Sequence, residues 1–463
     1  MSSSKQRFDH AVVLGGSFAG LLAARVLADR FARVTVLERD ALAGAAGHRK
    51  GTPQAHHAHA LLARGARLLA ERFPGFAEEV VAAGGRVADA GTGVRWLGPA
   101  GERIAQPIGG STFQLSRPAL EALVRRRVAA LANVALRGAM DVTGVRFDRS
   151  ERRFAAVSLR DAERPDAEID ADLIVDARGR ASRIVEWLGS HGVETPPETR
   201  IEIDLTYTTR LHRAPEKARG LIVTVGGEQA TRLGALLRLE GGRWMATLGG
   251  YCGDAAPRDD AGFLAFARSL ASPAYAEAIE GLEPLEETRS FRTPASLRRH
   301  FERSAEPAAG LIALGDAACA FNPVFGQGMS SAAMQAECLA DVLRDERAAA
   351  DGHDLVRDYY ARSAAAVDLP WRLAASEDFR VAGVRGKRPR AFSLQRRFGD
   401  RLRIAATRDP EVAAAFTRVG HLLAPMGSLF APRLLARIWR ASDRRGGARE
   451  VSGIAGLSGG ATG

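Results

Sequence analysis

The chain has 463 residues, of which 46% are hydrophobic and 26% are charged. Both fractions are average for globular proteins, and the length is roughly three times that of a typical domain, so intrinsic disorder and a single small module are excluded. The net charge of +11 comes from an arginine-rich region at 379–450, where few aromatic residues lie among the arginines, and this argues against nucleic-acid binding.

The first forty residues predict one βαβ unit of a parallel sheet. An apolar run at 10–15 ends in glycine, good helix formers follow at 21–28, and a second β-branched run occupies 33–38.

The glycines among the first forty residues argue against a secretory signal peptide, and no long apolar run predicts a membrane-spanning helix. Three scattered cysteines without a C-x-x-C pair suit a reducing compartment, so we expect a cytoplasmic protein.

A second unit of short strands interrupts the first. The glycine-rich segments at 84–118 predict strands and hairpins, and a helix is expected at 117–132. Apolar and polar residues alternate at 134–159, which predicts antiparallel strands. A buried strand at 171–176 then returns to the parallel sheet, and several β-like runs between 201 and 251 predict a mostly antiparallel sheet.

The last part of the chain is predicted to be helical. One more buried strand is expected at 311–315, followed by a helix at 329–347. Basic helices extend from there to about residue 445. The end of the chain is rich in glycine and serine, so we expect it to be disordered.

The turn of the βαβ unit carries a dinucleotide-binding fingerprint. It matches G-x-G-x-x-G except for one serine, a residue still small enough for the backbone to approach a pyrophosphate, and the following helix N-terminus supplies free N–H groups. Glu38 ends the next strand, where a carboxylate can accept ribose hydroxyls. An ordinary glycine turn with a surface glutamate is the competing interpretation. The fingerprint consists of Gly15, Gly16, Ser17, Phe18, Ala19 and Gly20.

A second signal lies far downstream, after the strand at 311–315. Asp316 follows Gly315 at the carboxyl end of that strand, where ligands bind in open α/β sheets, although an Asp here can also cap the next helix. A loop then leads from Asn322 into a helix, and its glycines permit a close backbone approach to a flat ring. The loop and helix start contain Pro323, Gly326, Gln327, Gly328 and Met329.

Together with Arg117 and the Asp-Ala-Arg-Gly-Arg stretch at 176–180, these motifs resemble the FAD-dependent monooxygenase superfamily, whose type member is p-hydroxybenzoate hydroxylase. The stretches 49–54, 57–59 and 61–65 are most similar to the branch that contains bacterial polyketide epoxidases. The resemblance covers about residues 8–430. It implies an α/β fold of two domains, with a Rossmann-like FAD-binding domain, an inserted antiparallel sheet domain for the substrate and a C-terminal helical region.

The resemblance also implies domain boundaries. The FAD-binding domain would comprise 8–83, 117–190 and 296–347, and the substrate domain would comprise 84–116 and 191–295. The helical region would span 348–445, followed by a disordered tail at 446–463.

The resemblance further assigns roles to residues. Gly15 to Gly20 would bind the FAD pyrophosphate, Glu38 the adenosine ribose and Asp316 the ribitol chain. Arg39 and Gly315 would also bind FAD. The loop and helix start from Pro323 to Met329 would lie beneath the flavin, where N–H groups and the helix dipole stabilise negative charge on the reduced ring. The remaining residues implied to contact FAD are Arg49, Arg117, Val142 and Asp176, the last with an ordinary strand-to-loop turn as an equal alternative.

The function implied is a monooxygenase in which a flavin C4a-hydroperoxide epoxidises or hydroxylates an apolar polyketide, terpenoid or aromatic compound. NAD(P)H would serve as a transient reductant, and no side chain is required as a nucleophile. Alternatives are a flavin reductase or dehydrogenase of the geranylgeranyl-reductase type, a halogenase, whose Trp-x-Trp-x-Ile-Pro motif is absent, or a non-catalytic flavoprotein or membrane-surface adaptor.

Two other features admit a second interpretation. His56, His57 and His59 invite a metal site, but no further ligand follows at a suitable spacing, and the family motif implies that the last two lie near the flavin. The apolar stretch 419–432 lies between arginines and is interpreted as a lid over the substrate pocket rather than as a membrane contact.

Overall fold

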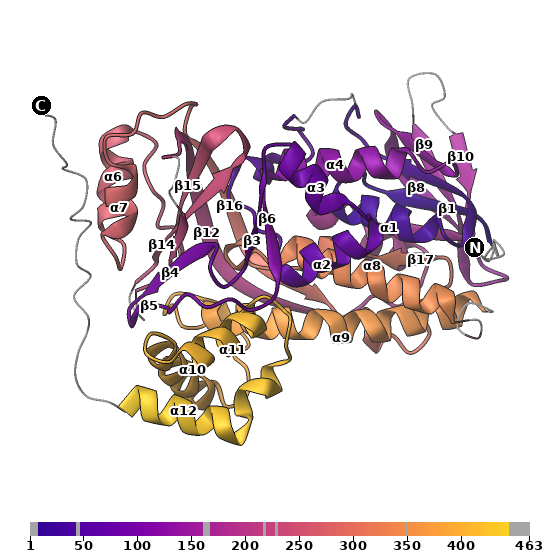
Figure 1. Ribbon diagram of the computed structural model, residues 1–463. Coiled ribbons are helices and arrows are strands. Elements are labelled where there is room, and N and C mark those ends of the chain that lie inside the picture. Colours follow the sequence, from indigo (N-terminus) through magenta and orange to yellow (C-terminus); the bar gives the residue numbers. More distant parts are fainter. Residues whose placement is uncertain are drawn as a thin grey trace, which may run out of the picture.

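The computed structural model describes residues 8–42, 47–160, 167–215, 219–226, 230–345, 347 and 351–443. A five-stranded sheet in the order β17-β11-β1-β2-β7 forms one half of the molecule (Figure 1), and all of its neighbours pair in parallel. Its central strands are buried, which explains their continuous apolar runs. The predicted βαβ unit and the later strands of this sheet are therefore confirmed. The strands are β1 (Phe8–Leu14), β2 (Phe31–Leu37), β7 (Val134–Arg137), β11 (Leu173–Asp176) and β17 (Leu311–Ala313).

The prediction of antiparallel strands throughout 134–159 is wrong for the first of them. β7 lies at the edge of the parallel sheet beside β2. Its residues alternate between half-buried and exposed because only one side of this edge strand faces the protein, and the same alternation is typical of antiparallel strands. The other strands do form an antiparallel sheet, made of β8 (Asp141–Asp148), β9 (Arg153–Arg160) and β10 (Ala167–Asp170).

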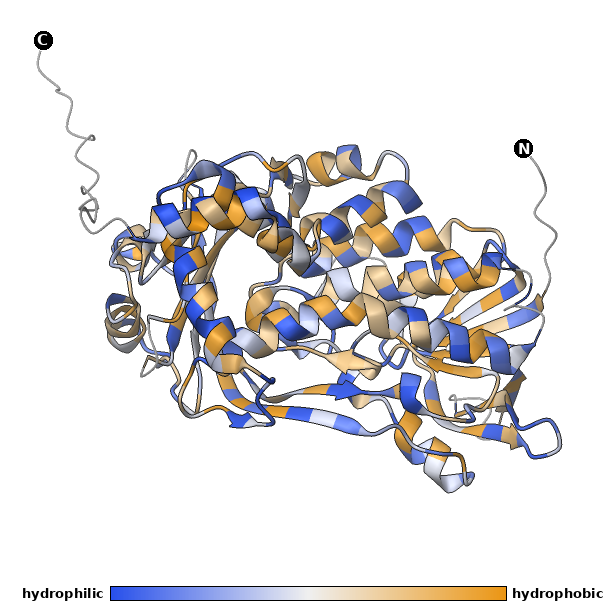
Figure 2. Ribbon diagram, turned by 90° about the horizontal axis from the view of Figure 1, so that it is seen from below, coloured by the Kyte–Doolittle hydropathy of each residue, from blue (hydrophilic) through white to orange (hydrophobic). Residues whose placement is uncertain are grey.

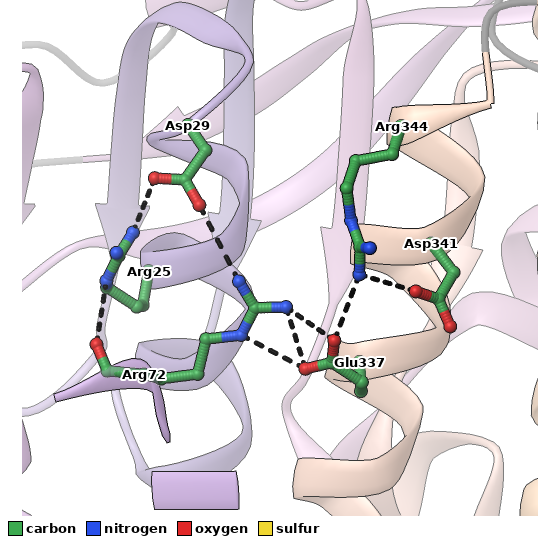
Figure 3. A network of polar contacts seen from close by, with 6 residues as sticks. All are labelled: Arg25, Asp29, Arg72, Glu337, Asp341 and Arg344. Carbon is green, nitrogen blue, oxygen red and sulfur yellow. Dashed lines mark hydrogen bonds and ion pairs between the residues drawn. The ribbon is translucent and has the colours of Figure 1, made fainter. Parts of the chain in front are cut away.

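Helices pack around the parallel sheet and are tied to one another by ion pairs. Figure 3 shows Arg72, at the end of α2, reaching Glu337 of α8 at 2.6 Å and Asp29, just after α1, at 3.7 Å. Asp29 also pairs with Arg25, and Glu337 with Arg344. The helices are α1 (Phe18–Leu27), α2 (Ala63–Arg72), α3 (Phe76–Ala82), α4 (Arg117–Ala129), α5 (Ile184–Ser190), α8 (Gly328–Arg344) and α9 (Gly352–Asp378).

A second, nine-stranded sheet lies beside the first, as the runs between 201 and 251 predict (Figure 1). Its path is β18-β16-β12-β15-β14-β13-β4-β5, with β19 paired to β12. The face of this sheet that points away from the parallel sheet is covered by α6 and α7 through one apolar cluster (Figure 1). Its elements are β4 (Val94–Gly98), β5 (Gly101–Glu102), β12 (Glu198–Arg213), β13 (Gly220–Val223), β14 (Arg232–Leu239), β15 (Arg243–Gly250), β16 (Arg289–Arg299), β18 (Cys319–Ala320), β19 (Arg385–Gly386), α6 (Asp260–Arg268) and α7 (Ala274–Ile279). A separate pair is formed by β3 (Arg86–Asp89) and β6 (Ser111–Gln114).

The C-terminal helices form a unit of their own around an apolar cluster. Along these ribbons Figure 2 shows alternating hydrophobic and hydrophilic bands, as expected for amphipathic helices. The unit is joined to the sheet by Arg103, whose guanidinium lies 5.0 Å from the ring of Trp96 and 4.2 Å from that of Phe416. It consists of α10 (Phe392–Ala406), α11 (Pro410–Gly420) and α12 (Pro432–Asp443).

Within the described part of the chain, no helix combines the length and apolarity needed to cross a bilayer. The predicted disordered tail lies outside the described residues, and the domain boundaries stay predictions. The apolar stretch 419–432 packs inward through Val419, Leu422 and Leu429, whereas Phe430 is half exposed. His421 accepts a hydrogen bond from the backbone N–H of Ala63 at 3.3 Å, so this stretch covers the start of α2.

Candidate functional site

One cavity of about 590 Å³ lies between the two sheets, at the carboxyl ends of β1, β11 and β17. Its size is within the usual range for ligand pockets, roughly 300–1,000 Å³. We call it the interdomain cavity and define it by the fingerprint loop on one side and the side chains of β12 and β16 on the other. Thirteen of the nineteen predicted site residues line it, namely Gly15, Ser17, Phe18, Ala19, Glu38, Arg39, Arg117, Val142, Asp316, Pro323, Gly326, Gly328 and Met329.

The fingerprint glycines are required by the backbone. Gly15 has φ +102°, and a Cβ there would lie 2.9 Å from the carbonyl oxygen of Ala177. A Cβ at Gly20 would lie only 1.8 Å from the carbonyl oxygen of Gly15. These close approaches bring the N-terminus of α1 to the cavity. Because no side chain caps that helix, its first N–H groups are available to an anion.

Glu38 lies directly after β2 and forms a hydrogen bond with the backbone of Gly16. The Glu38 carboxylate accepts the N–H of Gly16 at 2.7 Å and that of Asp40 at 3.1 Å, and it pairs with Arg49 at 3.2 Å. Glu38 is buried but lines the cavity. Arg49 and Gly16 do not line it, so Arg49 lies behind Glu38 rather than facing a ligand.

A buried glutamate that the sequence analysis missed organises the charges here. Glu121 of α4 pairs with Arg49 at 2.5 Å and accepts the hydroxyl proton of Ser17 at 2.5 Å. Burial alone would raise the pKa of Glu121, but Arg49 and then Arg117 outweigh it and lower the pKa. Glu121 follows Arg117 by four residues on one helix face, and this spacing was the available signal. Arg117 in turn donates to the Ser17 hydroxyl oxygen at 3.1 Å.

Asp316 lies deep in the cavity on the short helical turn after β17. Burial raises the pKa of its carboxyl group, while Arg180 and Arg117 oppose that shift. Gly315 does not line the cavity. It has φ +70°, and its N–H donates to Gln335 at 3.0 Å, so it shapes the turn that presents Asp316.

The loop before α8 closes one end of the cavity. Asn322 accepts the N–H of Val324 at 3.0 Å, and Gly326 has φ +61° with space for no Cβ, since Ala60 lies 2.8 Å from that position. α8 begins at Gly328, whose own Cβ position is open apart from an ordinary 3.7 Å contact with Asp316. Gln327 is buried behind the loop.

Asn322 is held in place by hydrogen bonds to two buried side chains, those of Tyr251 and Asp378. Its side-chain amide donates to the Tyr251 hydroxyl at 2.8 Å and to Asp378 Oδ1 at 2.5 Å, and Tyr251 also donates to Asp378 at 3.0 Å. Burial raises the pKa of Asp378 to about 7, against the lowering effect of both donors. Asp378 Oδ2 is buried without a partner.

Asp176, which the sequence predicts at the cofactor, does not line the interdomain cavity. Asp176 is fully buried and binds Arg178 with both oxygens, at 3.0 and 2.7 Å. Arg178 lies 4.3 Å from the ring of Trp187 and lines the cavity. Asp176 therefore positions Arg178. At the same end, Val142 lines the cavity beside Met140.

The three histidines lie in different surroundings. His57 and His59 line the cavity, whereas the ring of His56 stacks on His48 with centroids 3.4 Å apart. Among the described residues no cluster suited to a metal ion is found. Around His57 the cavity wall is aromatic and comprises Tyr207, Phe291 and Phe321.

The residues fit FAD. One end of the cavity offers an uncapped helix N-terminus for a pyrophosphate and a carboxylate for a ribose, and the other offers the 322–329 loop and α8 beside an aromatic wall. Two buried polar atoms beside the cavity, Arg117 Nε and Gln327 Oε1, have no partner. Such atoms in a native protein are normally satisfied, but these two are closed off from the cavity, so the fit of FAD rests on the two helix N-termini and the carboxylates that line the cavity.

The fold is shared with solved structures of flavin-dependent enzymes. The flavin-dependent brominase Bmp2 superimposes with a TM-score of 0.66 at 15% identity, covering 93% of this chain and 98% of Bmp2. p-Nitrophenol 4-monooxygenase PnpA from Pseudomonas putida gives 0.64 at 17% identity over 90% and 99%. PqsL from Pseudomonas aeruginosa, described as a probable FAD-dependent monooxygenase, gives 0.59 at 18% identity over 88% and 99%. The expected fold class is therefore confirmed.

At the level of sequence, the chain is 34% identical over 432 residues to Protein Rv3254 of Mycobacterium tuberculosis, which covers 90% of each protein. The chain belongs to the family of this protein. No family model matches it.

Proposed function

We propose that the protein is an FAD-dependent monooxygenase that epoxidises or hydroxylates an apolar small molecule. The observation that carries this proposal is the interdomain cavity, which joins a pyrophosphate-type helix N-terminus to an aromatic chamber without interruption. When bound, reduced FAD would activate O₂ for transfer of one oxygen atom. The balanced reaction consumes substrate, O₂, NAD(P)H and a proton and yields oxygenated product, water and NAD(P)⁺.

The chain's own residues bind and orient the participants. The first N–H groups of α1 and Arg117 stabilise the charge of the pyrophosphate, and Glu38 accepts ribose hydroxyls. Asp316 accepts hydrogen bonds from the ribitol chain. The N-terminus of α8 faces the ring end of the cavity, where its dipole stabilises negative charge. The aromatic wall excludes water and holds an apolar substrate.

A stopped-flow experiment tests the reaction. FAD-loaded protein is reduced anaerobically with NADH or NADPH and mixed with oxygenated buffer, with and without aromatic and alkene candidates. We expect a transient absorbance band distinct from oxidised and reduced flavin, and ¹⁸O from ¹⁸O₂ in the product. Direct return to oxidised flavin in every case contradicts the proposal and favours a reductase or dehydrogenase.

Two variants test whether FAD binds at the proposed site. Asp316→Asn should weaken FAD binding, because the ribitol hydroxyls lose a charged acceptor. Asp170→Asn, a change of the same kind at a residue whose side chain is 86% exposed, should leave FAD binding as it is. Equal affinity of both variants for FAD would contradict the placement of the cofactor.

A further inference from the structure

His57 occupies a particular place in the aromatic chamber of the interdomain cavity. It is 3% exposed, and its ring centroid lies 6.2 Å from that of Tyr207 and 5.9 Å from that of Phe291. The surrounding wall is apolar, so any hydrogen-bonding group of this ring that faces the cavity would orient a bound molecule strongly. Which ring nitrogen carries a proton therefore decides what the chamber can bind.

A chain of hydrogen bonds fixes the protonation of His57. The backbone N–H of Ala58 donates to Thr247 Oγ1 at 3.2 Å, Thr247 and Thr209 are joined through their hydroxyls at 2.7 Å, and Thr209 Oγ1 lies 2.8 Å from His57 Nδ1. These threonines face each other across β12 and β15. The described residues offer the Thr247 hydroxyl proton no acceptor except Thr209.

Only one arrangement of the hydroxyl protons along this row of hydrogen bonds gives every donor an acceptor. Ala58 donates to Thr247, Thr247 donates to Thr209, and Thr209 donates to His57 Nδ1. The reverse direction would bury the Thr247 proton, in a residue only 1% exposed, without an acceptor, and such a group costs about 1–3 kcal/mol. His57 Nδ1 is thus an acceptor, and in the neutral ring the proton is on Nε2.

The ring is neutral at physiological pH. Burial, followed by the nearby His56 and Arg289, lowers the pKa of His57 to about 4. No acceptor for Nε2–H is found among the described residues, and Nε2 is not one of the polar atoms sealed inside the protein. His57 therefore presents a single donor to the cavity.

We propose that His57 Nε2–H donates a hydrogen bond to a carbonyl or phenolic oxygen of an aromatic or conjugated substrate. The proposal rests on the proposed function. His57 is accordingly a residue for substrate recognition, and Thr209 and Thr247 are positioning residues that act through its tautomer.

His59 provides an internal reference with the opposite tautomer. Its Nδ1 lies 2.9 Å from the carbonyl oxygen of His57, and only a protonated nitrogen can donate to a carbonyl oxygen. Burial, followed by Arg117, lowers the pKa of His59 to about 3, so its Nε2 is an acceptor. One short segment thus presents a donor from His57 and an acceptor from His59.

Nitrogen NMR tests the tautomer without any turnover. Protein labelled with ¹⁵N-histidine is recorded at pH 7.5, and His57→Gln and His59→Gln assign the two rings. We expect an Nε2–H pattern for His57 and an Nδ1–H pattern for His59. Thr209→Val should abolish the single tautomer of His57, whereas Thr208→Val should not, because the Thr208 hydroxyl bonds to Ala256 instead, at 2.8 Å. An Nδ1–H pattern for His57 in the native protein overturns the proposal.

Binding to the FAD-loaded protein tests recognition. The probes are 2-acetylnaphthalene and its isostere 2-isopropenylnaphthalene, which lacks the oxygen, and the signal is perturbation of the flavin spectrum. We expect the ketone to bind about 3- to 10-fold more tightly, as one net hydrogen bond allows. His57→Leu should remove this preference, and His57→Gln should retain part of it. No preference in the native protein, no detectable ketone binding, or an unchanged preference in His57→Leu overturns the proposal.

The two experiments also separate this inference from the proposed function. Failure to bind FAD contradicts the proposed function, but the tautomer of His57 can still be measured. Normal FAD binding together with the wrong tautomer contradicts the recognition role alone.

Discussion

At the scale of single residues, Arg49 is held between the carboxylates of Glu38 and Glu121, at 3.2 and 2.5 Å, with only 9% of its side chain exposed. Two buried carboxylates in one place are stable only while a cation lies between them. Arg49 therefore keeps the fingerprint loop in position through both partners, since Glu38 binds the Gly16 N–H and Glu121 binds the Ser17 hydroxyl.

Arg49→Met should lower the free energy of unfolding of FAD-free protein by about 3 kcal/mol, because it leaves buried carboxylates without their central partner. Urea denaturation measures this as a lower midpoint at unchanged slope. The matched control is Arg67→Met, which removes an exposed pair with Glu71 and should cost less than about 1 kcal/mol. Equal losses in both variants would show that Arg49 has no special role.

The residues of the candidate site could be predicted from the sequence where a single motif specifies them. The fingerprint, Asp316 and the 322–329 loop were all anticipated, and the structure places them around one cavity. Arg49 and Asp176 were expected at the cofactor and instead support Glu38 and Arg178 from behind. A sequence shows that such a charge is present, but whether it faces a ligand or a neighbouring side chain depends on contacts between distant segments.

At the scale of elements, the 322–329 loop is positioned by the ends of β15 and α9. Asp378 is the last residue of α9, Tyr251 follows β15, and both bind Asn322. The unpartnered Asp378 Oδ2 and the raised pKa, about 7, indicate that the folded protein holds a proton there over a range in which the unfolded chain does not.

The sign of the resulting pH dependence follows. Between about pH 4 and pH 7 the folded state binds one more proton than the unfolded state, so this group's contribution to stability falls as pH rises through that window. Asp378→Asn keeps an acceptor and cannot ionise. Its stability relative to the native protein should therefore increase from pH 4 to pH 7, by at most about 4 kcal/mol, and level off above. Urea midpoints of both proteins across this pH range measure the difference in stability. A difference that does not change with pH would show that Asp378 is not protonated in the folded protein.

Gly326 should be indispensable to the same loop. With φ +61° and Ala60 at 2.8 Å from its Cβ position, Gly326→Ala should cost at least about 1–2 kcal/mol. Gly420→Ala is the control, since nothing lies within 4 Å of that position and φ is not positive. Thermal unfolding of FAD-free protein compares the two, and a Tm of Gly326→Ala equal to that of the control would contradict the argument.

Elements were predicted well where both faces of a strand are buried and less well where only one face is covered. The fully buried β11 and β17 have continuous apolar runs that indicate their place. β7 alternates because only one of its two faces is covered by the protein, and the pairing of its neighbour along the chain, β8, is different. Local pattern does not distinguish these cases, because which strand lies alongside is a long-range property.

At the scale of the whole molecule, the two sheets are held together around the cavity. Arg180, in the turn after β11, donates to the carbonyl oxygens of Ala295 at 2.7 Å and Phe321 at 3.1 Å, so it fixes the nine-stranded sheet and the 322–329 loop against the parallel sheet. A ligand that fills the cavity contacts both halves and should stabilise them together.

FAD should therefore raise the free energy of unfolding by about 2.7 kcal/mol when its free concentration is 100 times Kd. Differential scanning calorimetry measures the rise in Tm with FAD concentration. Riboflavin, which lacks the pyrophosphate and adenosine, cannot use the fingerprint loop and should raise Tm much less. Equal effects of both compounds would show that the α1 end of the cavity is not used.

The order of strands β17-β11-β1-β2-β7 has a consequence for biosynthesis. β1 and β2 are made first, but β17 and the start of α8 emerge only after more than 300 residues have been translated. A nascent chain thus carries the fingerprint long before it carries Asp316 and the 322–329 loop. We therefore expect flavin capture to be a late event in synthesis, and ribosome-bound chains that end before β17 should retain no FAD.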